Sequence, residues 1–353
     1  MKFKTKTSPF YNSTSNINGV MLQVLYALMP GTIVMCVFFG WGILFNIVLA
    51  IVFALALEAI ALKIRNRPVM PFLSDLSATT AAWLFALTLP PLVPWWIVFV
   101  GIFFVIIVAK HLYGGIGYNP FNPAMVGYAV LIVSFPFEMS QWINPNNELF
   151  SFSESFSFVF GSEKPEWDAI TAATPLDEIK TGFRAGAEYS AIAAKSAYLQ
   201  NASQNTWLWS SLAFALGGAW LLHKKIIHWQ IPFALLGSLA LISSIFYLIS
   251  PTNFGSPLFH IISGASVIGA FFIATDPVSA STTPMGKIIY GACIGILIYI
   301  IRTWGNYPDA IAFGVLIMNM AVPLIDYYTQ PRVLGHTKKG QKNKEHLNKG
   351  DSL

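Results

Sequence analysis

Long apolar runs constrain the fold of this chain more than any other feature. Ten segments are each apolar over about the 20 residues that a helix needs to cross a bilayer. They are residues 20–38, 41–62, 73–91, 93–109, 121–137, 206–222, 229–250, 257–274, 286–302 and 307–326. Only 10% of all residues are charged, against roughly a quarter in soluble domains. The sequence therefore predicts an all-α polytopic membrane protein of about ten transmembrane helices.

Several of these runs contain residues that interrupt helices. Pro30-Gly31 is expected to break the first run, and "TLPPLVP" separates the third from the fourth. The stretch "HLYGGIGYNPFNPAM" before the fifth is too rich in Gly, Pro and Asn for a simple apolar helix. Irregular backbone at membrane depth persists only where protein or a polar cavity satisfies it. We therefore expect several broken helices.

Basic residues predict the orientation. With the N-terminus in the cytoplasm, sixteen of the 21 Lys and Arg residues fall inside, and four of the other five lie in one long loop. The positive-inside rule counts short loops, so both termini are expected to be cytoplasmic and the long loop outside. The basic N-terminus lacks the pattern of a cleaved signal peptide, and the basic tail is expected to lie near anionic lipid rather than nucleic acid.

Five runs on each side of the long loop suggest two inverted repeats. "NPAMVGYAVLI" at 122–132 resembles "YPDAIAFGVLI" at 307–317, although two unrelated apolar helices that begin with proline would also look alike. The predicted division is an N-terminal segment 1–19, a first repeat 20–137, an exported loop 138–205, a second repeat 206–326 and a tail 327–353.

Ionisable residues in apolar runs are costly unless paired, so they are candidates for function. Glu58 is the preferred residue for an ion path, with an interfacial position beside Lys63 and Arg65 as the alternative. Asp276 and Asp309 adjoin prolines and either line such a path or cap half-helices.

The Gly-rich break offers a second group of candidates. It carries hydrogen-bonding side chains and glycines that permit close backbone approach, as a cofactor or a partner chain requires. A broken helix that satisfies its own carbonyls is an equal alternative. The residues are Lys110, Gly114, Gly115, Asn119 and Asn122.

The exported loop contains "DAITAATPLDEIK", Asp168 to Lys180. Pro175 suits the first position of a helix, which makes Thr174 the expected N-cap and Asp177 the third helical residue. Taken alone, this pattern is a capping motif.

Cysteine usage excludes several site types. Cys36 and Cys293 are far apart in apolar segments, so neither a disulfide nor a metal site is expected. The sequence has no Cys cluster for an iron–sulfur centre and no Gly-rich dinucleotide fingerprint. No catalytic residue is assigned.

Four motifs, in order along nearly the whole chain, resemble a known family. "GGIGYNPFNPAM", "DAITAATPLD", "ATDPVSASTTPMGK" and "YPDAIAFGVLIMNMAVPLID" are similar to the D subunits of Rnf (Rsx) electron transport complexes and, more distantly, to the B subunits of sodium-pumping NADH:quinone oxidoreductases. The resemblance implies a ten-helix inverted-repeat fold similar to urea and ammonium transporters. It also implies FMN esterified through its phosphate to the last threonine of an Asp-x-x-[Ser/Thr]-x-Ala-Thr signature, here Thr174, with Asp168 and Thr171 at the other marked positions.

This resemblance gives the loop a chemical interpretation. A hydroxyl that accepts a flavin phosphate must be open, which suits small neighbours such as Ala173. A phosphate on Thr174, ahead of Pro175, would face unpaired N–H groups and the positive end of the helix dipole.

The implied function is that of a membrane electron carrier in a bacterial cytoplasmic (inner) membrane complex that couples ferredoxin/NAD electron transfer to Na⁺ or H⁺ translocation. The chain alone is not expected to be an enzyme. The implied partners are other membrane and peripheral subunits, including iron–sulfur and NAD-binding subunits and a second covalent-FMN subunit, together with membrane lipid and a flavin transferase. Noncovalent riboflavin is a candidate second cofactor. Two alternatives remain: a channel or secondary transporter for a small solute without flavin, and a structural scaffold.

Overall fold

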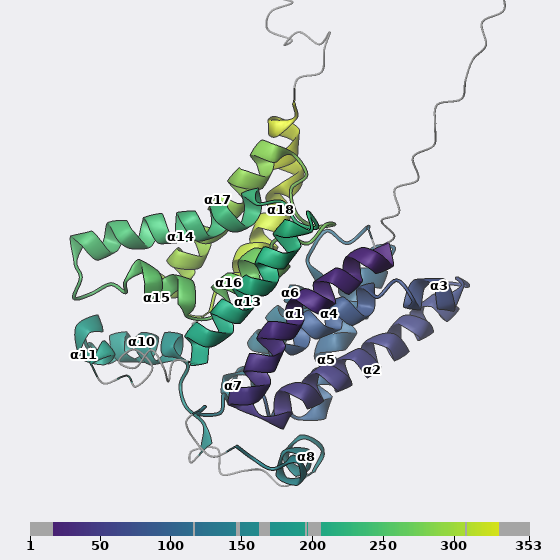
Figure 1. The fold of residues 1–353 in the computed structure, drawn as a ribbon, viewed down its shortest axis with the longest axis horizontal. Coiled ribbons are helices and arrows are strands. Elements are labelled where there is room, and N and C mark those ends of the chain that lie inside the picture. The colour runs from purple at the N-terminus through teal and green to yellow at the C-terminus, as the bar shows by residue number, and fades with distance from the viewer. Residues whose placement is uncertain are drawn as a thin grey trace, which may run out of the picture.

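The computed structural model describes residues 17–115, 117–145, 149–161, 170–194, 196, 206–307 and 309–331. Within these ranges every regular element is helical (Figure 1). The only β feature of the described chain is an isolated antiparallel bridge between Ile143 and Thr171.

Five helices are long and apolar enough to cross a membrane, and they coincide with the first, second, seventh, ninth and tenth expected runs. They are α1 (Ile17–Phe39), α2 (Trp41–Ile64), α14 (Gln230–Ile249), α17 (Pro284–Trp304) and α18 (Ile311–Thr329). Many of their large apolar side chains are exposed, as expected of surfaces that face lipid. The prediction of a helical polytopic membrane protein is confirmed.

The remaining apolar runs form shorter or broken helices, as expected at "TLPPLVP" and at the Gly-rich stretch, whereas the break inside the eighth run was not predicted. The sixth run is the 18-residue α13 (Thr206–His223). The others give α3 (Val69–Leu73), α4 (Ser77–Ala86), α5 (Trp95–Phe103) with the π-helix η1 (Phe104–His111), α6 (Pro123–Ser134), α15 (Pro257–Ile262), α16 (Ser266–Ile268) and the π-helix η3 (Gly269–Ile273).

The expected break at Pro30-Gly31 is wrong, because α1 is continuous through it. The proline removes a single backbone donor, and the turns on both sides keep their hydrogen bonds. Packing favours the continuous helix, since Gly31 leaves room for the ring of Phe214 on α13. A local helix-breaking signal is thus overridden by tertiary contact.

The long loop is itself structured where it is described. It carries α8 (Phe152–Phe160), α10 (Pro175–Arg184) and α11 (Tyr189–Ala193), and α7 (Pro136–Ser140) lies at its start. Figure 1 shows α7, α8, α10 and α11 along the lower side of the molecule, with α10 and α11 below α15.

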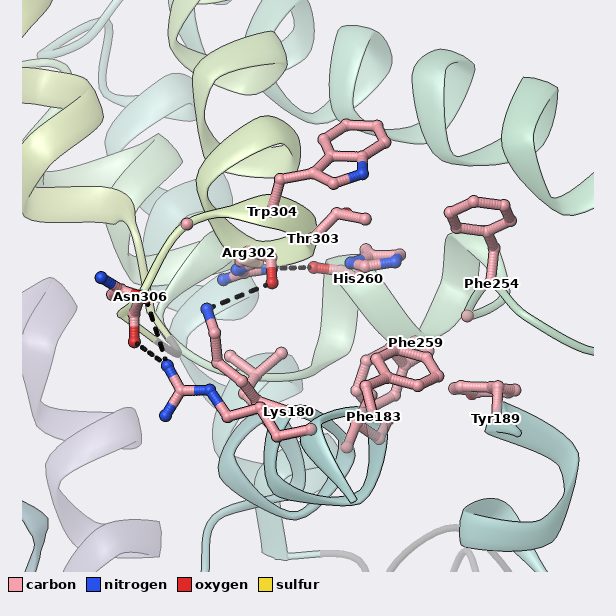
Figure 2. Close-up of a pocket in the computed structure, with 15 residues that line it drawn as sticks. Lys180, Phe183, Tyr189, Phe254, Phe259, His260, Arg302, Thr303, Trp304 and Asn306 are labelled. Carbon is pink, nitrogen blue, oxygen red and sulfur yellow. Dashed lines mark hydrogen bonds between the residues drawn. The ribbon is translucent and has the colours of Figure 1, made fainter. Parts of the chain in front are cut away.

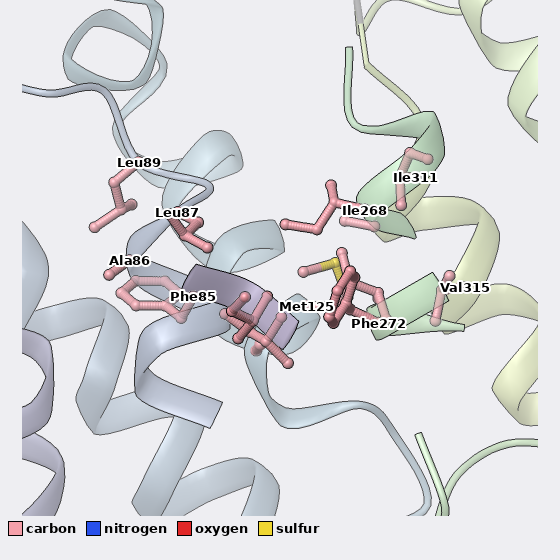
Figure 3. Close-up of a cluster of buried hydrophobic side chains, with 14 of the residues drawn as sticks. Phe85, Ala86, Leu87, Leu89, Met125, Ile268, Phe272, Ile311 and Val315 are labelled. Carbon is pink, nitrogen blue, oxygen red and sulfur yellow. The ribbon is translucent and has the colours of Figure 1, made fainter. Parts of the chain in front are cut away.

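The apolar core lies where the N-terminal and C-terminal groups of helices meet. Phe85 of α4 and Met125 of α6 face Phe272 of η3 and Val315 of α18 across this boundary (Figure 3). The helices α1 and α13 also pack side by side across it. The broken helices are therefore central, and the long apolar ones surround them.

A substitution at Gly217 of α13 tests the close contact between α1 and α13. A Cβ at this position would overlap the carbonyl oxygen of Ala27, whereas a Cβ at Gly237 of α14 meets no atom within 4 Å. Overpacking a fitted contact costs about 1–3 kcal/mol, while alanine in an open helical position is favoured over glycine by about 1 kcal/mol. Gly217→Ala should therefore lower the thermal unfolding midpoint in detergent, and the matched control Gly237→Ala should leave it unchanged or raise it. Equal midpoints for both variants would contradict the close crossing.

Candidate functional site

The segment before Thr174 is held by backbone pairing. The Asn144 N–H donates to the carbonyl of Ile170, and the Ala172 N–H donates to the carbonyl of Trp142, each at 3.0 Å. Ile143, opposite Thr171 in this bridge, is buried. The chain that leaves α7 therefore fixes the path of residues 170–172. Asp168 lies outside the described residues.

Thr174 is the N-cap of α10, as the sequence predicts. Its Oγ1 accepts from the Asp177 N–H at 3.3 Å and donates to Asp177 Oδ2 at 2.7 Å. Pro175 is the first helical residue, and it is buried. Thr174 itself is half-buried and Ala173 is exposed. The hydroxyl is therefore oriented by its own helix while its small neighbour leaves one side open.

A cavity of about 450 Å³ lies beside this cap. Thr174 and Asp177 line it from the loop, and residues of both groups of helices line the rest. Its wall is rich in aromatic rings: Tyr128, Trp142, Trp207, Phe214 and Tyr307. A cavity of this kind accommodates a planar organic molecule.

Sequence reasoning did not identify these aromatic residues. They come from α6, the start of the long loop, α13 and the segment before α18, and no spacing in the sequence links them. Only the tertiary structure gathers them around Thr174.

The cationic side chains of α10 fix this helix to the end of α17 and to the segment before α18. Lys180 Nζ donates to the carbonyl of Tyr307 at 2.6 Å and lies 3.4 Å from the carbonyls of Ile301 and Arg302. Arg184 donates to the side chain of Asn306 at 3.3 Å. These contacts run along a smaller cavity of about 260 Å³ (Figure 2). The carbonyls at the end of α17 thus obtain donors from the loop.

The electrostatics of α10 depend on its burial. Burial raises the pKa of Asp177, and the hydrogen bonds from Thr174 oppose this rise. Burial, together with the nearby charge of Arg184, lowers the pKa of Lys180 to about 8. The pKa values of both groups are therefore shifted toward neutral pH by burial in the protein.

Asp309 lines the 450 Å³ cavity beside Thr174, and it makes structural contacts there. It pairs with Arg302 at 3.0 Å and accepts the Ala265 N–H at 2.9 Å. Arg302 also donates to the carbonyl of His260 at 2.8 Å. Asp309 thus ties the break between α15 and α16 to the start of α18, whereas its predicted role in an ion path stays a prediction.

A second polar cluster is buried at the other end of the molecule. Lys110 Nζ lies 2.6 Å from Glu58 Oε1 and donates to Ser77 Oγ at 2.8 Å, while His111 Nε2 lies 3.6 Å from the same carboxylate oxygen. The side chains of Glu58 and Lys110 are 1% and 5% exposed. Glu58 therefore lies inside the protein rather than at the surface beside Lys63 and Arg65.

The structure thus joins two candidates that the sequence analysis treated separately. Lys110 was assigned to the Gly-rich break and Glu58 to an ion path, and they form one ion pair. The separation of 52 residues between them explains why no local pattern revealed it.

The Gly-rich break satisfies much of its own backbone. Gly114 and Gly115 have φ angles of 131° and 106°, which side-chain-bearing residues rarely adopt, and the Gly115 N–H donates to the carbonyl of Lys110 at 3.0 Å. Asn119 donates to the carbonyl of Phe121 at 3.0 Å. These contacts agree with the alternative of a self-satisfied broken helix.

Asn122 and Asp276 flank the irregular backbone between the two groups of helices. Asn122 caps α6 through Met125 N and donates to the carbonyl of Ile273, at 3.2 and 3.1 Å. Asp276 accepts the N–H and hydroxyl of Ser279 at 2.9 and 2.7 Å. Both therefore have a local structural use, and their roles in ion or flavin binding remain predictions.

Among the described residues, no group of His, Cys, Asp and Glu is suited to a metal ion.

A double-mutant cycle tests the ion pair between Glu58 and Lys110. Lys110→Met leaves a buried carboxylate without its cation and should destabilise the protein by about 3–5 kcal/mol. Glu58→Leu/Lys110→Met removes both charges and should recover most of that loss. The measurement is the thermal unfolding midpoint of each variant in detergent. Additive losses in the double variant would contradict the pairing.

Lys180 should show the pH dependence of a lysine with a lowered pKa. Only the neutral amine reacts with an acylating reagent, so the reaction rate at Lys180 should rise with pH and reach its midpoint near pH 8. The rate can be followed by mass spectrometry of the peptide that carries Lys180, and Lys180→Arg identifies that peptide. A midpoint near that of free lysine, about 10.4, would contradict the burial of this amine.

Known proteins are similar to this chain over nearly its full length. Residues 4–335 match the model of the NQR2, RnfD, RnfE family. The D subunit of the ion-translocating oxidoreductase complex of Aliivibrio salmonicida is 46% identical over 352 residues, which cover 96% of this chain and 100% of the relative. The proteins of the same name from Vibrio vulnificus and Alcanivorax borkumensis are 46% and 48% identical; these alignments cover 95% of this chain and 100% and 98% of the relatives. The chain belongs to the NQR2, RnfD, RnfE family.

Proposed function

We propose that this chain is the D subunit of an ion-translocating oxidoreductase complex and carries FMN esterified to Thr174. Relatives of that name align over nearly the full length of both chains. The observation that carries the flavin proposal is the position of Thr174, at the N-terminus of α10 and in the wall of an aromatic cavity.

The residues at the cap fit a phosphoester. A phosphate on Oγ1 would lie at a helix N-terminus, where backbone N–H groups are available. Esterification removes the hydroxyl proton that Thr174 donates to Asp177. Burial raises the pKa of Asp177, and the negative charge of a phosphate beside this carboxyl would raise the pKa further.

The neighbouring residues have distinct tasks in this proposal. Thr171 lies in the bridge that fixes the approach to the site, Ala173 leaves room for a flavin transferase, and Pro175 sets the start of α10. Asp168 belongs to the same attachment signature.

The aromatic walls would hold and orient the ring system. Trp142 and Trp207 offer faces for stacking, and Tyr128 adds a hydroxyl. Arg184 brings positive charge to the same cavity. A bound flavin supplies the electron-transfer chemistry, whereas the protein determines its position and surroundings.

We further propose that the helices form ten spans in two inverted halves, as in urea and ammonium transporters. The third and eighth runs are both broken, and the fifth and tenth each have a proline near their start, Pro123 and Pro308. Lys110 near the end of the fourth run and Arg302 near the end of the ninth are both buried and ion-paired. Both termini would lie in the bacterial cytoplasm and the loop outside the cytoplasmic membrane.

In this arrangement the two ion pairs lie at opposite ends of the spans. Glu58 would be reached from the cytoplasmic side and Asp309 from the outside, with Asp276 at the intervening break. We propose these acids as elements of a path for Na⁺ or H⁺. Riboflavin near Asn119 and Asn122 is the corresponding proposal for a second cofactor.

Electron donors and acceptors must be other chains. The sequence has no cysteine cluster for an iron–sulfur centre. We propose iron–sulfur and NAD-binding subunits and a second covalent-FMN subunit as partners, with a flavin transferase for maturation.

Flavin fluorescence in a denaturing gel tests the attachment. After expression with a flavin transferase, the native chain should give a fluorescent band, because a covalent flavin survives denaturation. Thr174→Val should abolish the fluorescence because it removes the hydroxyl. Thr174→Ser retains both hydroxyl and N-cap and should remain fluorescent.

The loss of the N-cap in Thr174→Val can be distinguished from the loss of covalent flavin. Loss of an N-cap costs about 1 kcal/mol, so the amount of folded Thr174→Val should be measured by size-exclusion chromatography alongside the gel. A dark native band, with a competent transferase shown on another substrate, would refute the flavin proposal and favour the solute transporter.

A further inference from the structure

The short helix α8 has an aromatic stripe that the proposed flavin site does not use. Phe152, Phe156 and Phe160 recur every four residues, so they lie along one side of the helix. Their exposed fractions are 53%, 48% and 39%. Exposed aromatic rows of this kind mark an interaction surface.

Contacts with a membrane-spanning helix fix the depth of this stripe. All three rings pack against Phe45 of α2, with ring centroids 5.1, 6.1 and 6.2 Å from it. Trp41, the first residue of α2, lies 5.5 Å from Phe152. Phe45 is about one turn into α2, since a turn has 3.6 residues. The stripe therefore lies where α2 enters the membrane.

The orientation of α8 agrees with this depth. In Figure 1 α8 is seen end-on, whereas α1, α2 and α13 run along the picture. Its axis thus crosses those of the membrane-spanning helices, as does that of a helix lying in the plane of a bilayer surface. Ser155 and Val159 are each 1% exposed and fix the adjacent side of α8 to the protein.

The charge of α8 indicates which part of the lipid it meets. Glu154 is its only charged residue, and it closes a capping box in which the Ser151 N–H donates to Oε2 at 2.8 Å. α8 has no basic residue, so attraction to anionic headgroups does not contribute. Its contact must depend on apolar area.

We propose that α8 lies in the outer interface of the bilayer, with Phe152, Phe156 and Phe160 against lipid acyl chains. The partner is the lipid itself, because the stripe continues the lipid-facing surface of α2 at Trp41 and Phe45. Trp41 on that surface is 46% exposed. Such helices bury their apolar face roughly 5–10 Å below the headgroups. α8 thereby fixes part of the long loop at a set height above the membrane.

Spin labels at adjacent residues test the proposal. Single cysteines replace Phe156 or Ser157 in a chain with Cys36→Ser and Cys293→Ser, and the full chain is reconstituted with its complex in bilayers. Successive helical residues point about 100° apart, so the label at 156 should face lipid and the label at 157 should lie nearer water. The ratio of collision rates with oxygen and with a water-soluble nickel reagent should be several-fold higher at 156.

Two results would overturn the proposal. A nickel collision rate at 156 equal to that at 157 would place the stripe in water. Exclusion of both reagents at 156 would show that a protein partner covers it.

The unaltered protein provides a second measurement. A phospholipid with a photoreactive group near the carbonyl end of its acyl chain should label the peptide that contains residues 152–160. Absence of this product, while peptides of α2 are labelled, would refute the contact even if a cysteine variant failed to fold.

Discussion

Unpaired backbone groups at breaks in membrane helices are the constraint on which this structure depends. Each such group costs several kcal/mol in an apolar environment, and the chain breaks at least two of its apolar runs in the middle of the protein. Side chains from distant segments supply the missing partners. Asp309 binds the N–H of Ala265, Asn122 binds the carbonyl of Ile273, and Lys180 binds the carbonyl of Tyr307 after α17. The polar residues of the apolar runs are thus first of all structural.

The same contacts position the candidate site. Lys180 fixes α10 to the segment between α17 and α18, and Thr174 at the N-terminus of α10 lines the cavity. The bridge at Ile143 and Thr171 fixes the other approach to this threonine. A loop attached at both sides can hold a cofactor at a defined distance from the membrane, and electron transfer requires such a distance. In our proposal the broken helices therefore support the flavin site as well as the membrane core.

Buried charges connect stability with the proposed ion path. Glu58 and Lys110 satisfy each other at one end, and Asp309 and Arg302 do so at the other. One oxygen of Glu58, Oε2, has no hydrogen-bond partner among the described residues. A pair with spare hydrogen-bonding capacity can hold its charge and still accept an ion or a proton, so the structural and transport roles of these acids are compatible.

The sequence by itself determined the class of the protein and much of its local structure. Hydropathy depends on composition over about 20 residues, so the apolar runs were visible, and so were the interruptions in "GGIGYNPFNPAM". The cap at Thr174-Pro175 was visible because capping involves only neighbouring residues. Pro30 shows the limit of such rules, since packing against α13 overrode it.

The tertiary structure alone decided which distant residues meet. It paired Glu58 with Lys110, gathered Trp142, Trp207 and Tyr128 around Thr174, and placed the stripe of α8 beside Phe45. These contacts arise from how apolar helices cross, and nearly every helix is apolar on all sides, so no periodic pattern indicates its neighbours. Local chemistry is thus encoded in short stretches of the chain, whereas the site that uses it depends on helix packing.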